Sequence, residues 1–248
     1  MLKAIFFDLD GTIRHNEPRG FDVFAEHASS LGLRVRDDDL LRAMRWEHYY
    51  WANSRELIHD QSRHGRLTVE FWAAYAQRQL TALGASNKQA AALAPAMNAY
   101  MEASYNPGSV VPADLSAVLE ALTGAGYKLG VISNRDKPYQ DLLAELGLAQ
   151  HFPYTLASGE INAWKPDPKI FLHACKQQGV APAESAYVGD NYFADVVGAR
   201  AAGVTPVLYD PRGIFDNPQC ATIRQFTELP RALGVNDAAT RSKTAKAS

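Results

Sequence analysis

The chain has 248 residues, of which 25 are Lys or Arg and 27 are Asp or Glu, giving a formal net charge of −2. With 47% hydrophobic and 21% charged residues, it has the composition of an ordinary globular protein with core enough for one large or two modest domains. The balanced charge argues against nucleic acid as a partner, and no cationic amphipathic segment or acidic tail indicates a membrane.

The two cysteines, Cys175 and Cys220, are too few and too far apart for a disulfide framework or a metal site. They therefore favour a reducing compartment. The apolar run 4–7 near the N-terminus is far too short for a signal peptide, and Asp8 interrupts it. The expectation is a cytoplasmic protein.

The first predicted element is a buried parallel strand over Ala4–Phe7, followed at once by polar residues. Asp8 and Asp10 are two residues apart, so on an extended chain both point to the same side. Gly11 lets the chain turn away and lets a ligand approach the backbone. Neighbouring carboxylates repel each other, and a hard divalent cation such as Mg²⁺ would offset that repulsion. A strand that simply ends in an Asp-rich turn is the alternative.

Between 21 and about 105 the pattern changes, because Ala, Leu, Gln and Arg dominate and no convincing strand appears. This composition predicts a helical insert. Linkers rich in proline, glycine and asparagine, around Pro18 and Pro107, join it to the rest of the chain. The predicted helices are one long helix from Asp37–Asp39 to about His59, a second opened by Thr68, and a third that follows a capping box of Ser86 and Gln89 and is kinked by Pro95.

From Asp114 onward predicted helices and strands alternate, which implies a parallel, doubly wound sheet. We therefore expect an α/β, Rossmann-like core domain over 1–17 and 109–235, a smaller all-α domain over 18–108, and a flexible tail over 236–248. The predicted strands are 128–132, 154–157, 186–189 and 206–209, and the predicted helices are 115–124, 138–146, 168–179 and 193–202, with Asp167 capping the third of these.

Ligands of such sheets bind beyond the carboxyl ends of the strands, beside the switch in strand order. Three of the predicted strand ends carry reactive side chains, and a lysine lies between the last two. They are Asp8 and Asp10, then Ser133 and Asn134, then Lys165, and last Asp190 with Asp195 five residues later. Each has an ordinary explanation alone, such as a helix cap or a solvated lysine. Gathered at one edge, they are the groups that phosphoryl transfer needs.

The motifs Asp8-Leu9-Asp10-Gly11-Thr12, Ser133-Asn134, Lys165-Pro166-Asp167-Pro168 and Gly189-Asp190 through Asp195 resemble, in order and spacing, the four motifs of the haloacid dehalogenase superfamily. They are most similar to its phosphatase branch, and the helical insert resembles the cap domain of that family. The resemblance implies a Mg²⁺-dependent phosphatase that acts on a small phosphate ester through an aspartyl-phosphate.

In that family pattern, Asp8 is the nucleophile and Asp10 the general acid and base. Mg²⁺ is held by the Asp8 carboxylate, the Asp10 backbone carbonyl and Asp190. Ser133 and Lys165 bind the phosphoryl oxygens, with Thr12 and Asn134 supporting the phosphate site. Asp195 orients Lys165 or a metal-bound water.

Three alternatives remain at this stage. A phosphomutase shares every motif and returns the phosphoryl group to a sugar. A 2-haloacid dehalogenase is disfavoured because that branch has no Asp at the position of Asp10. A non-catalytic regulatory module would be expected to have lost a metal ligand or the nucleophile, and neither is missing here.

Substrate specificity is expected to lie in the helical domain, which would close over the site and exclude water. On the predicted helix that follows Asp39, five side chains share one face at helical spacing: Arg42, Arg45, Trp46, Tyr49 and Asn53. Packing and solvation account for most of them, and the sharper hypothesis is that Arg45 or Tyr49 contacts the leaving group. Arg14 and His15 either reach the substrate or form a solvated hinge.

Overall fold

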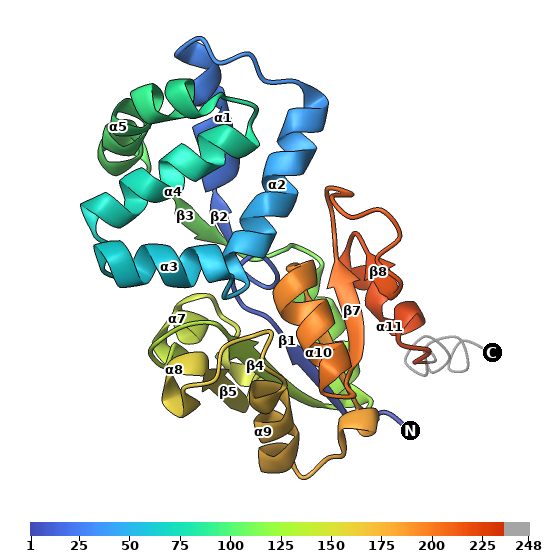
Figure 1. Ribbon diagram of the computed structural model, residues 1–248. Helices are drawn as coiled ribbons and strands as arrows, with labels where there is room; N and C mark the ends of the chain where they lie inside the picture. Colours follow the sequence, from blue (N-terminus) through green and yellow to red (C-terminus); the bar gives the residue numbers. More distant parts are fainter. Residues whose placement is uncertain (236–248) are drawn as a thin grey trace, which may run out of the picture. The chain divides into compact units, whose positions relative to one another are not determined.

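The computed structural model describes residues 1–235, and it divides into two compact units (Figure 1). One unit, called here the α/β unit, comprises residues 1–15 and 110–235 of the described chain. The other, the helical unit, comprises residues 16–109. The segment 236–248, for which we expected a flexible tail, lies outside the described residues.

The α/β unit is built on a six-stranded sheet in the order β5-β4-β1-β6-β7-β8, in which every pair of neighbours is parallel. After β1, the next strands of the sheet, β4 and β5, lie on one side of it, and β6, β7 and β8 lie on the other. The strand order therefore reverses at β1, which is the switch point of this doubly wound sheet. The strands are β1 (Ala4–Phe7), β4 (Lys128–Ser133), β5 (Tyr154–Ala157), β6 (Ser185–Gly189), β7 (Thr205–Tyr209) and β8 (Ala221–Ile223).

Both faces of this sheet are covered by helices, as a doubly wound fold requires. Ile5 and Phe7 of β1 point into one apolar core, with α6 (Leu115–Gly124), α7 (Gln140–Glu145) and α11 (Leu229–Ala232). Ala4 and Phe6 point into the other, with α9 (Pro168–Gln178) and α10 (Val197–Ala201). A strand buried on both sides is apolar at every position, which explains why 4–7 is an unbroken apolar run.

Most elements of this unit were predicted from the sequence, and two of the helices differ in detail. The cap of α9 is confirmed, because Asp167 accepts from the backbone N–H of Lys169 and Pro168 is the first helical residue. The helix expected from Pro138 begins only at Gln140. The helix expected over 193–202 starts as a π-helical turn, η3 (Tyr192–Val196), before α10 continues it.

Several short elements were not predicted, because three- or four-residue segments without an unbroken apolar run carry too little pattern. In the α/β unit they are β8, α8 (Ser158–Ile161), α11, and the 3₁₀ turns η1 (Ala149–His151), η2 (Pro182–Glu184) and η4 (Phe226–Glu228). Two more, β2 (His15–Glu17) and β3 (Gly108–Val110), pair with each other where the chain passes between the two units.

The helical unit contains no strand within residues 18–107 and consists of helices packed around α4 and α5. The start of α4 after Thr68 and the capping box of α5 are both confirmed. Its helices are α1 (Gly20–Ser30), α2 (Asp37–Trp51), α3 (Arg55–His64), α4 (Val69–Ala82) and α5 (Asn87–Ser104, with Pro95 inside it).

The prediction of one long helix from Asp37–Asp39 to His59 was wrong. The chain breaks at Asn53, whose φ of 53° is left-handed, and Ser54 then caps α3 by accepting from the N–H of Leu57. The N-cap of α2 is Arg36, and Asp39 accepts its backbone N–H. Asn-Ser within a helical pattern was the available signal for the break, since both residues favour helix ends over helix interiors.

Candidate active site

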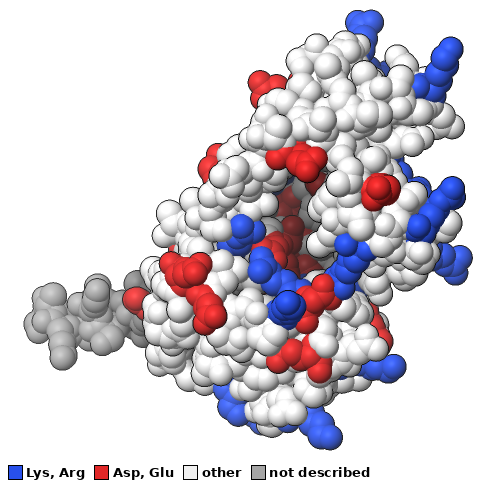
Figure 2. All heavy atoms as spheres, turned by 90° about the vertical axis from the view of Figure 1, so that its left-hand side faces the viewer, with Lys and Arg blue, Asp and Glu red and all other residues white. Residues whose placement is uncertain are grey.

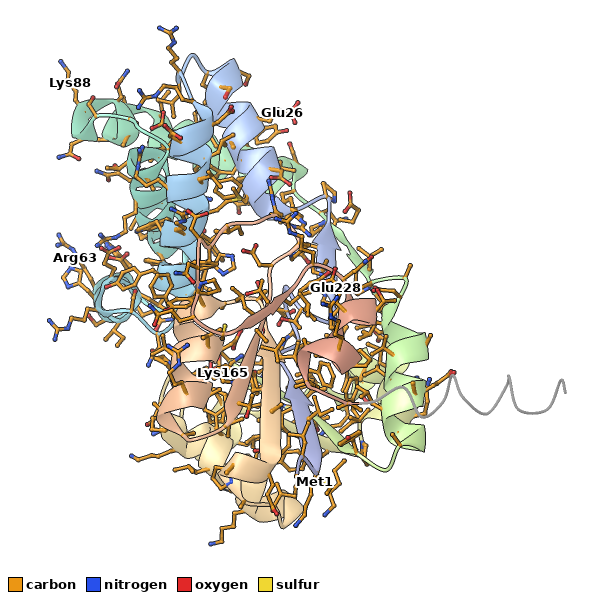
Figure 3. All side chains as sticks on the ribbon, turned by 90° about the vertical axis from the view of Figure 1, so that its right-hand side faces the viewer. Met1, Glu26, Arg63, Lys88, Lys165 and Glu228 are labelled. Atoms are coloured by element: carbon orange, nitrogen blue, oxygen red, sulfur yellow. The ribbon has the colours of Figure 1, made fainter. Side chains whose placement is uncertain are left out.

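Asp8 follows β1 directly, and it meets Lys165 at the carboxyl end of the sheet. Lys165 is buried, and its Nζ donates to Asp8 Oδ1 at 2.6 Å, to Asp195 Oδ1 at 2.6 Å and to the Tyr187 hydroxyl at 2.9 Å. These three bonds use all three donors of the ammonium group and fix its position. Figure 3 shows Lys165 inside the α/β unit, whereas Arg63 and Lys88 of the helical unit point outward.

Asp190 follows β6, which is the strand beside β1. Thr12 is fully buried, and its hydroxyl donates to Asp190 Oδ1 at 3.1 Å and accepts from the Asp190 N–H at 3.0 Å. Gly11 has a φ of +91°, and a Cβ there would overlap the Asp190 carboxylate. The Asp-Gly-Thr sequence is therefore needed to bring Asp190 against the end of β1.

Asp195 lies on η3 and is almost completely buried. Besides the bond from Lys165, it accepts the N–H of Asn191 through Oδ2 at 2.9 Å. A Cβ at Gly189 would overlap the Asp195 side chain, so only glycine permits this approach. Asp195 is thus in direct contact with Lys165, and its role stays a prediction.

One carboxylate oxygen from each of Asp8, Asp190 and Asp195 lies within 4.8 Å of the other two. Burial raises the pKa of Asp8 and of Asp190 to about 7, and the charges of Asp195 and Asp8, respectively, add to this rise. Burial also raises the pKa of Asp195. Burial alone would lower the pKa of Lys165, but the charges of Asp195 and Asp8 outweigh it and hold the pKa above its usual value.

This cluster is short of positive charge, because three carboxylates, those of buried Asp8 and Asp195 and half-buried Asp190, lie around one ammonium group. Hard carboxylate oxygens at this spacing fit Mg²⁺, which prefers oxygen ligands and one or two carboxylates. The fit supports the predicted roles of Asp8 and Asp190 as metal ligands. The side chain of Asp10, in contrast, does not belong to the cluster; only its backbone carbonyl was expected to bind metal.

The Ser133–Asn134 pair ends β4 and leads into the loop before α7. The Asn134 side chain accepts the N–H of Lys165 at 2.7 Å and donates to its carbonyl oxygen at 3.0 Å. It also accepts from the hydroxyl of Ser158 at 2.8 Å. Asn134 thereby holds the backbone of Lys165, while Ser133 is buried at the strand end itself.

The Asp10 carboxylate is bound by two arginines. Arg135 donates Nε to Oδ2 and Nη2 to Oδ1, both at 2.8 Å, and Arg14 donates Nη1 to Oδ1 at 3.1 Å. The contact with Asp10 was not among the roles considered for Arg14, and its reach toward the substrate stays a prediction. His15 lies with its ring 5.9 Å from that of Tyr209.

Sequence reasoning missed Arg135 and Tyr187. Arg135 directly follows Ser133-Asn134, so its position on a site loop was a usable signal. Tyr187 lies in an otherwise apolar strand, and a buried phenol needs a hydrogen-bond partner. Its hydroxyl accepts from Lys165 and donates to the Ile132 carbonyl oxygen at 2.7 Å.

In the helical unit, several residues of the α2 face that we singled out have structural partners. Arg42 pairs with Asp39 at 2.7 Å, and the ring of Trp46 lies 5.1 Å from that of Tyr50. Packing therefore accounts for these two residues, while a role for Arg45 or Tyr49 in specificity stays a prediction. A groove of about 820 Å³ lies between α3, α4 and α5, and none of its lining residues belongs to the acidic cluster.

The surface carries charges of both signs. On the face shown in Figure 2, acidic and basic side chains are interspersed over both units, without an extended patch of one sign among the described residues. Within residues 1–235, none of the helices combines the length and the apolar character needed to cross a membrane.

Comparison with known proteins gives a family and a set of relatives. The sequence model of the haloacid dehalogenase-like hydrolases matches residues 2–203. The chain is 33% identical to haloacid dehalogenase-like hydrolase domain-containing protein 3 of Bos taurus, over 84% of this chain and 81% of that protein. It is 30% identical to a phosphoserine phosphatase of Thermus thermophilus, over 86% and 90%. A crystal structure of a phosphatase of this family from Thermococcus onnurineus superposes with a TM-score of 0.55 at 29% identity, over 95% and 99%.

Proposed function

Since the chain belongs to the haloacid dehalogenase-like hydrolases, we propose that it is a Mg²⁺-dependent phosphatase that hydrolyses a small phosphorylated metabolite through an aspartyl-phosphate on Asp8. The observation that carries the proposal is the contact of Asp8 with Lys165 beside Asp190 in one acidic cluster. The phosphatases among its relatives support a phosphoric monoester hydrolase.

Asp8 and Lys165 perform the first step. Lys165 engages Asp8 through Oδ1, so we assign Oδ2 as the oxygen that forms the bond to phosphorus. As that bond forms, the bond from phosphorus to the ester oxygen breaks. The Asp10 side chain gives a proton to the departing oxygen. The Ser133 hydroxyl donates to a phosphoryl oxygen, and the positive charge of the Lys165 ammonium beside Asp8 stabilises the negative charge on these oxygens.

Asp10 also acts in the second step. It takes a proton from a water molecule, whose oxygen bonds to phosphorus while the bond between phosphorus and Asp8 breaks. Inorganic phosphate leaves and the Asp8 carboxylate is restored. When bound by Asp8, Asp190 and the Asp10 carbonyl, Mg²⁺ supplies positive charge that the transferring phosphoryl group needs.

The remaining residues position these groups. Thr12 is completely buried against Asp190, so we assign its role to holding that carboxylate. Asn134 and Asp195 hold Lys165 from its backbone and its ammonium, respectively. The helical unit is assigned the role of a cap that excludes water and selects the substrate.

The test is release of inorganic phosphate from an aryl phosphate and a panel of phosphorylated metabolites, with Mg²⁺ and with a chelator. Hydrolysis that requires Mg²⁺ and is lost in Asp8→Asn supports the proposal. Activity that survives either change contradicts it. Product analysis separates a hydrolase from a phosphomutase, because only the hydrolase releases phosphate in proportion to the substrate consumed.

A further inference from the structure

Arg135 binds Asp10 in a geometry that is specific for carboxylates. Its two donors, Nε and Nη2, each lie 2.8 Å from a different oxygen of the same carboxylate. Two parallel N–H···O bonds of this kind are the strong, directional form of arginine recognition. The two donors of Arg135 are therefore set at the spacing that a carboxylate needs, and in this structure Asp10 occupies them.

The two arginines on Asp10 are not equivalent. The Arg14 side chain is 16% exposed and that of Arg135 is 36% exposed. The Arg14 backbone is tied to the loop that carries Asp10, since its N–H donates to Leu9 and its carbonyl accepts from Gly11. Arg135 comes from a different strand end, after β4. The Arg135 carbonyl accepts from the Gly159 N–H, so the two arginines differ in side-chain exposure, and the more exposed Arg135 is the better placed to exchange its partner.

The position of Arg135 along the site follows from its neighbours. Asn134 is anchored to the Lys165 backbone by two hydrogen bonds, which fixes the start of the loop beside the phosphate-binding groups. The Arg135 side chain reaches Asp10, and in the proposed function Asp10 faces the leaving oxygen. A group bound by Arg135 would therefore belong to the leaving portion of the substrate rather than to the transferred phosphoryl group.

We propose that Arg135 is a specificity-determining residue that binds a carboxylate on the leaving portion of the substrate, in exchange for Asp10. The inference rests on the proposed phosphatase function and assigns its substrate class: phosphate monoesters with a carboxylate a few atoms from the ester oxygen. Asp10 keeps its bond from Arg14 and, with two bonds fewer, turns toward the leaving oxygen. A substrate without a second anion offers Arg135 no replacement for Asp10. Arg135 then stays bound to the Asp10 carboxylate, which cannot turn toward the leaving oxygen.

The first test compares 3-phosphoglycerate with glycerol 3-phosphate, which differ only in a carboxylate against a hydroxymethyl group. In the wild-type protein, kcat/KM should favour the carboxylate by about 10- to 100-fold, the usual value of hydrogen bonds between charged groups. In Arg135→Gln the ratio should fall to within a few-fold of one. Arg231→Gln, which alters an exposed arginine of the same unit, should keep the wild-type ratio.

A wild-type ratio near one, or a ratio that Arg135→Gln leaves unchanged, overturns the proposal. If the glutamine variant lacks the circular dichroism spectrum of the folded protein, Arg135→Lys replaces it. Lysine keeps the charge but cannot form two parallel bonds, so the ratio should drop several-fold, and an unchanged ratio again overturns the proposal.

The second test does not depend on turnover. Binding of the same two esters to Asp8→Asn is measured by calorimetry in the presence of Mg²⁺. The preference for the carboxylate should appear there and be lost in the double variant with Arg135→Gln. If the wild-type protein hydrolyses neither ester, the proposed function is tested on other substrates, while the binding preference or its absence still decides the role of Arg135.

Discussion

Both units bury aspartates, but they neutralise them in opposite ways. In the helical unit, the carboxylate of Asp60 accepts two bonds from Arg78, at 2.7 and 2.9 Å, and one from the Tyr50 hydroxyl. In the α/β unit, Asp8, Asp190 and Asp195 share the single ammonium of Lys165. Buried charge is thus balanced within the first cluster and left in excess in the second.

The pKa values follow this difference. Burial opposes ionisation of Asp60, yet Arg78 outweighs it and lowers the pKa of that carboxyl. Hydrogen bonds from Arg36 and Arg42 hold the pKa of Asp39 well below its usual range. Burial raises the pKa of Asp8 and Asp190 to about 7. A buried aspartate with its own arginine is a structural group, whereas a cluster with excess negative charge indicates a site for a cation.

The largest expected effect is on catalysis, from Asp8→Asn. The amide keeps the shape of the side chain but is not a nucleophile, so the turnover number should fall by roughly 10⁴-fold or more. Phosphate release in the presence of Mg²⁺ measures this. Glu145→Gln, on the exposed face of the same unit, is the control. Near-normal release by Asp8→Asn would refute the assignment of the nucleophile.

The second prediction concerns pH and Mg²⁺. Since the pKa values of Asp8 and Asp190 in the folded protein exceed the unfolded value of about 3.9, the native state binds more protons between about pH 4 and 7. Without metal, the contribution of this pair to stability should therefore fall as the pH rises through that window. Mg²⁺ binds the ionised carboxylates, so the rise in Tm that it causes should grow with pH by several degrees.

Variants from the two units sharpen this test. Asp190→Asn removes one of the two carboxyl groups with a raised pKa. It should reduce both the fall in stability of the metal-free protein with rising pH and the rise in Tm that Mg²⁺ causes. Asp60 has a lowered pKa, and its stabilisation is lost only as the pH falls below about 4. Asp60→Asn should therefore leave the slope between pH 4 and 7 unchanged, and an equal change in both variants would remove the distinction between the clusters.

The third prediction removes a neutralising partner in the helical unit. Arg78→Met leaves the buried Asp60 carboxylate with Tyr50, and the free energy of unfolding should fall by about 2 kcal/mol, a value reduced for the partial exposure of Arg78. Denaturant unfolding followed by tryptophan fluorescence reports it, since Trp46 and Trp51 pack against the aromatic cluster of this unit. Arg63→Met, an exposed neighbour on α3, should cost less than about 0.5 kcal/mol.

The smallest effect is expected for Tyr187→Phe. Loss of one of the three partners of the Lys165 ammonium should lower kcat about 3- to 10-fold and leave KM nearly unchanged. Tyr139 is the matched control, because it is also buried and its hydroxyl donates to backbone carbonyls without contacting Lys165. Tyr139→Phe should reduce stability but keep kcat. Equal kcat values for the two variants would argue against a positioning role of Tyr187.

The sequence was sufficient to predict most strands of the parallel sheet and the residues at their carboxyl ends. Apolar segments such as 4–7 and 129–132, each followed directly by polar residues, located the strands and the residues that end them. The helical unit was harder, because the break between α2 and α3 depends on Asn53 and Ser54, two residues within a continuous helical pattern. Whether a helix breaks at such residues depends on how the two helices pack in the folded protein, which a local pattern does not show.

The partners of the site residues could not be predicted in the same way. The contacts of Lys165 with Tyr187, and of Arg135 with Asp10, join residues 22 and 125 positions apart. Such pairs depend on the register of neighbouring strands and on the path of the loops, which no local pattern encodes. Motif order told us which residues gather, and the structure shows which atoms meet.

The central claim, that a carboxylate oxygen of Asp8 captures phosphorus, is tested most directly by trapping the intermediate. Wild-type protein and Asp10→Asn are mixed with Mg²⁺ and an aryl phosphate, whose aryloxide leaves without a proton from Asp10, then quenched in acid within one turnover and mapped by peptide mass spectrometry. The phosphoryl mass should lie on Asp8 and should accumulate in Asp10→Asn, where the water is not activated. Phosphoryl mass on another residue, or phosphate release with neither protein ever phosphorylated, would contradict the account.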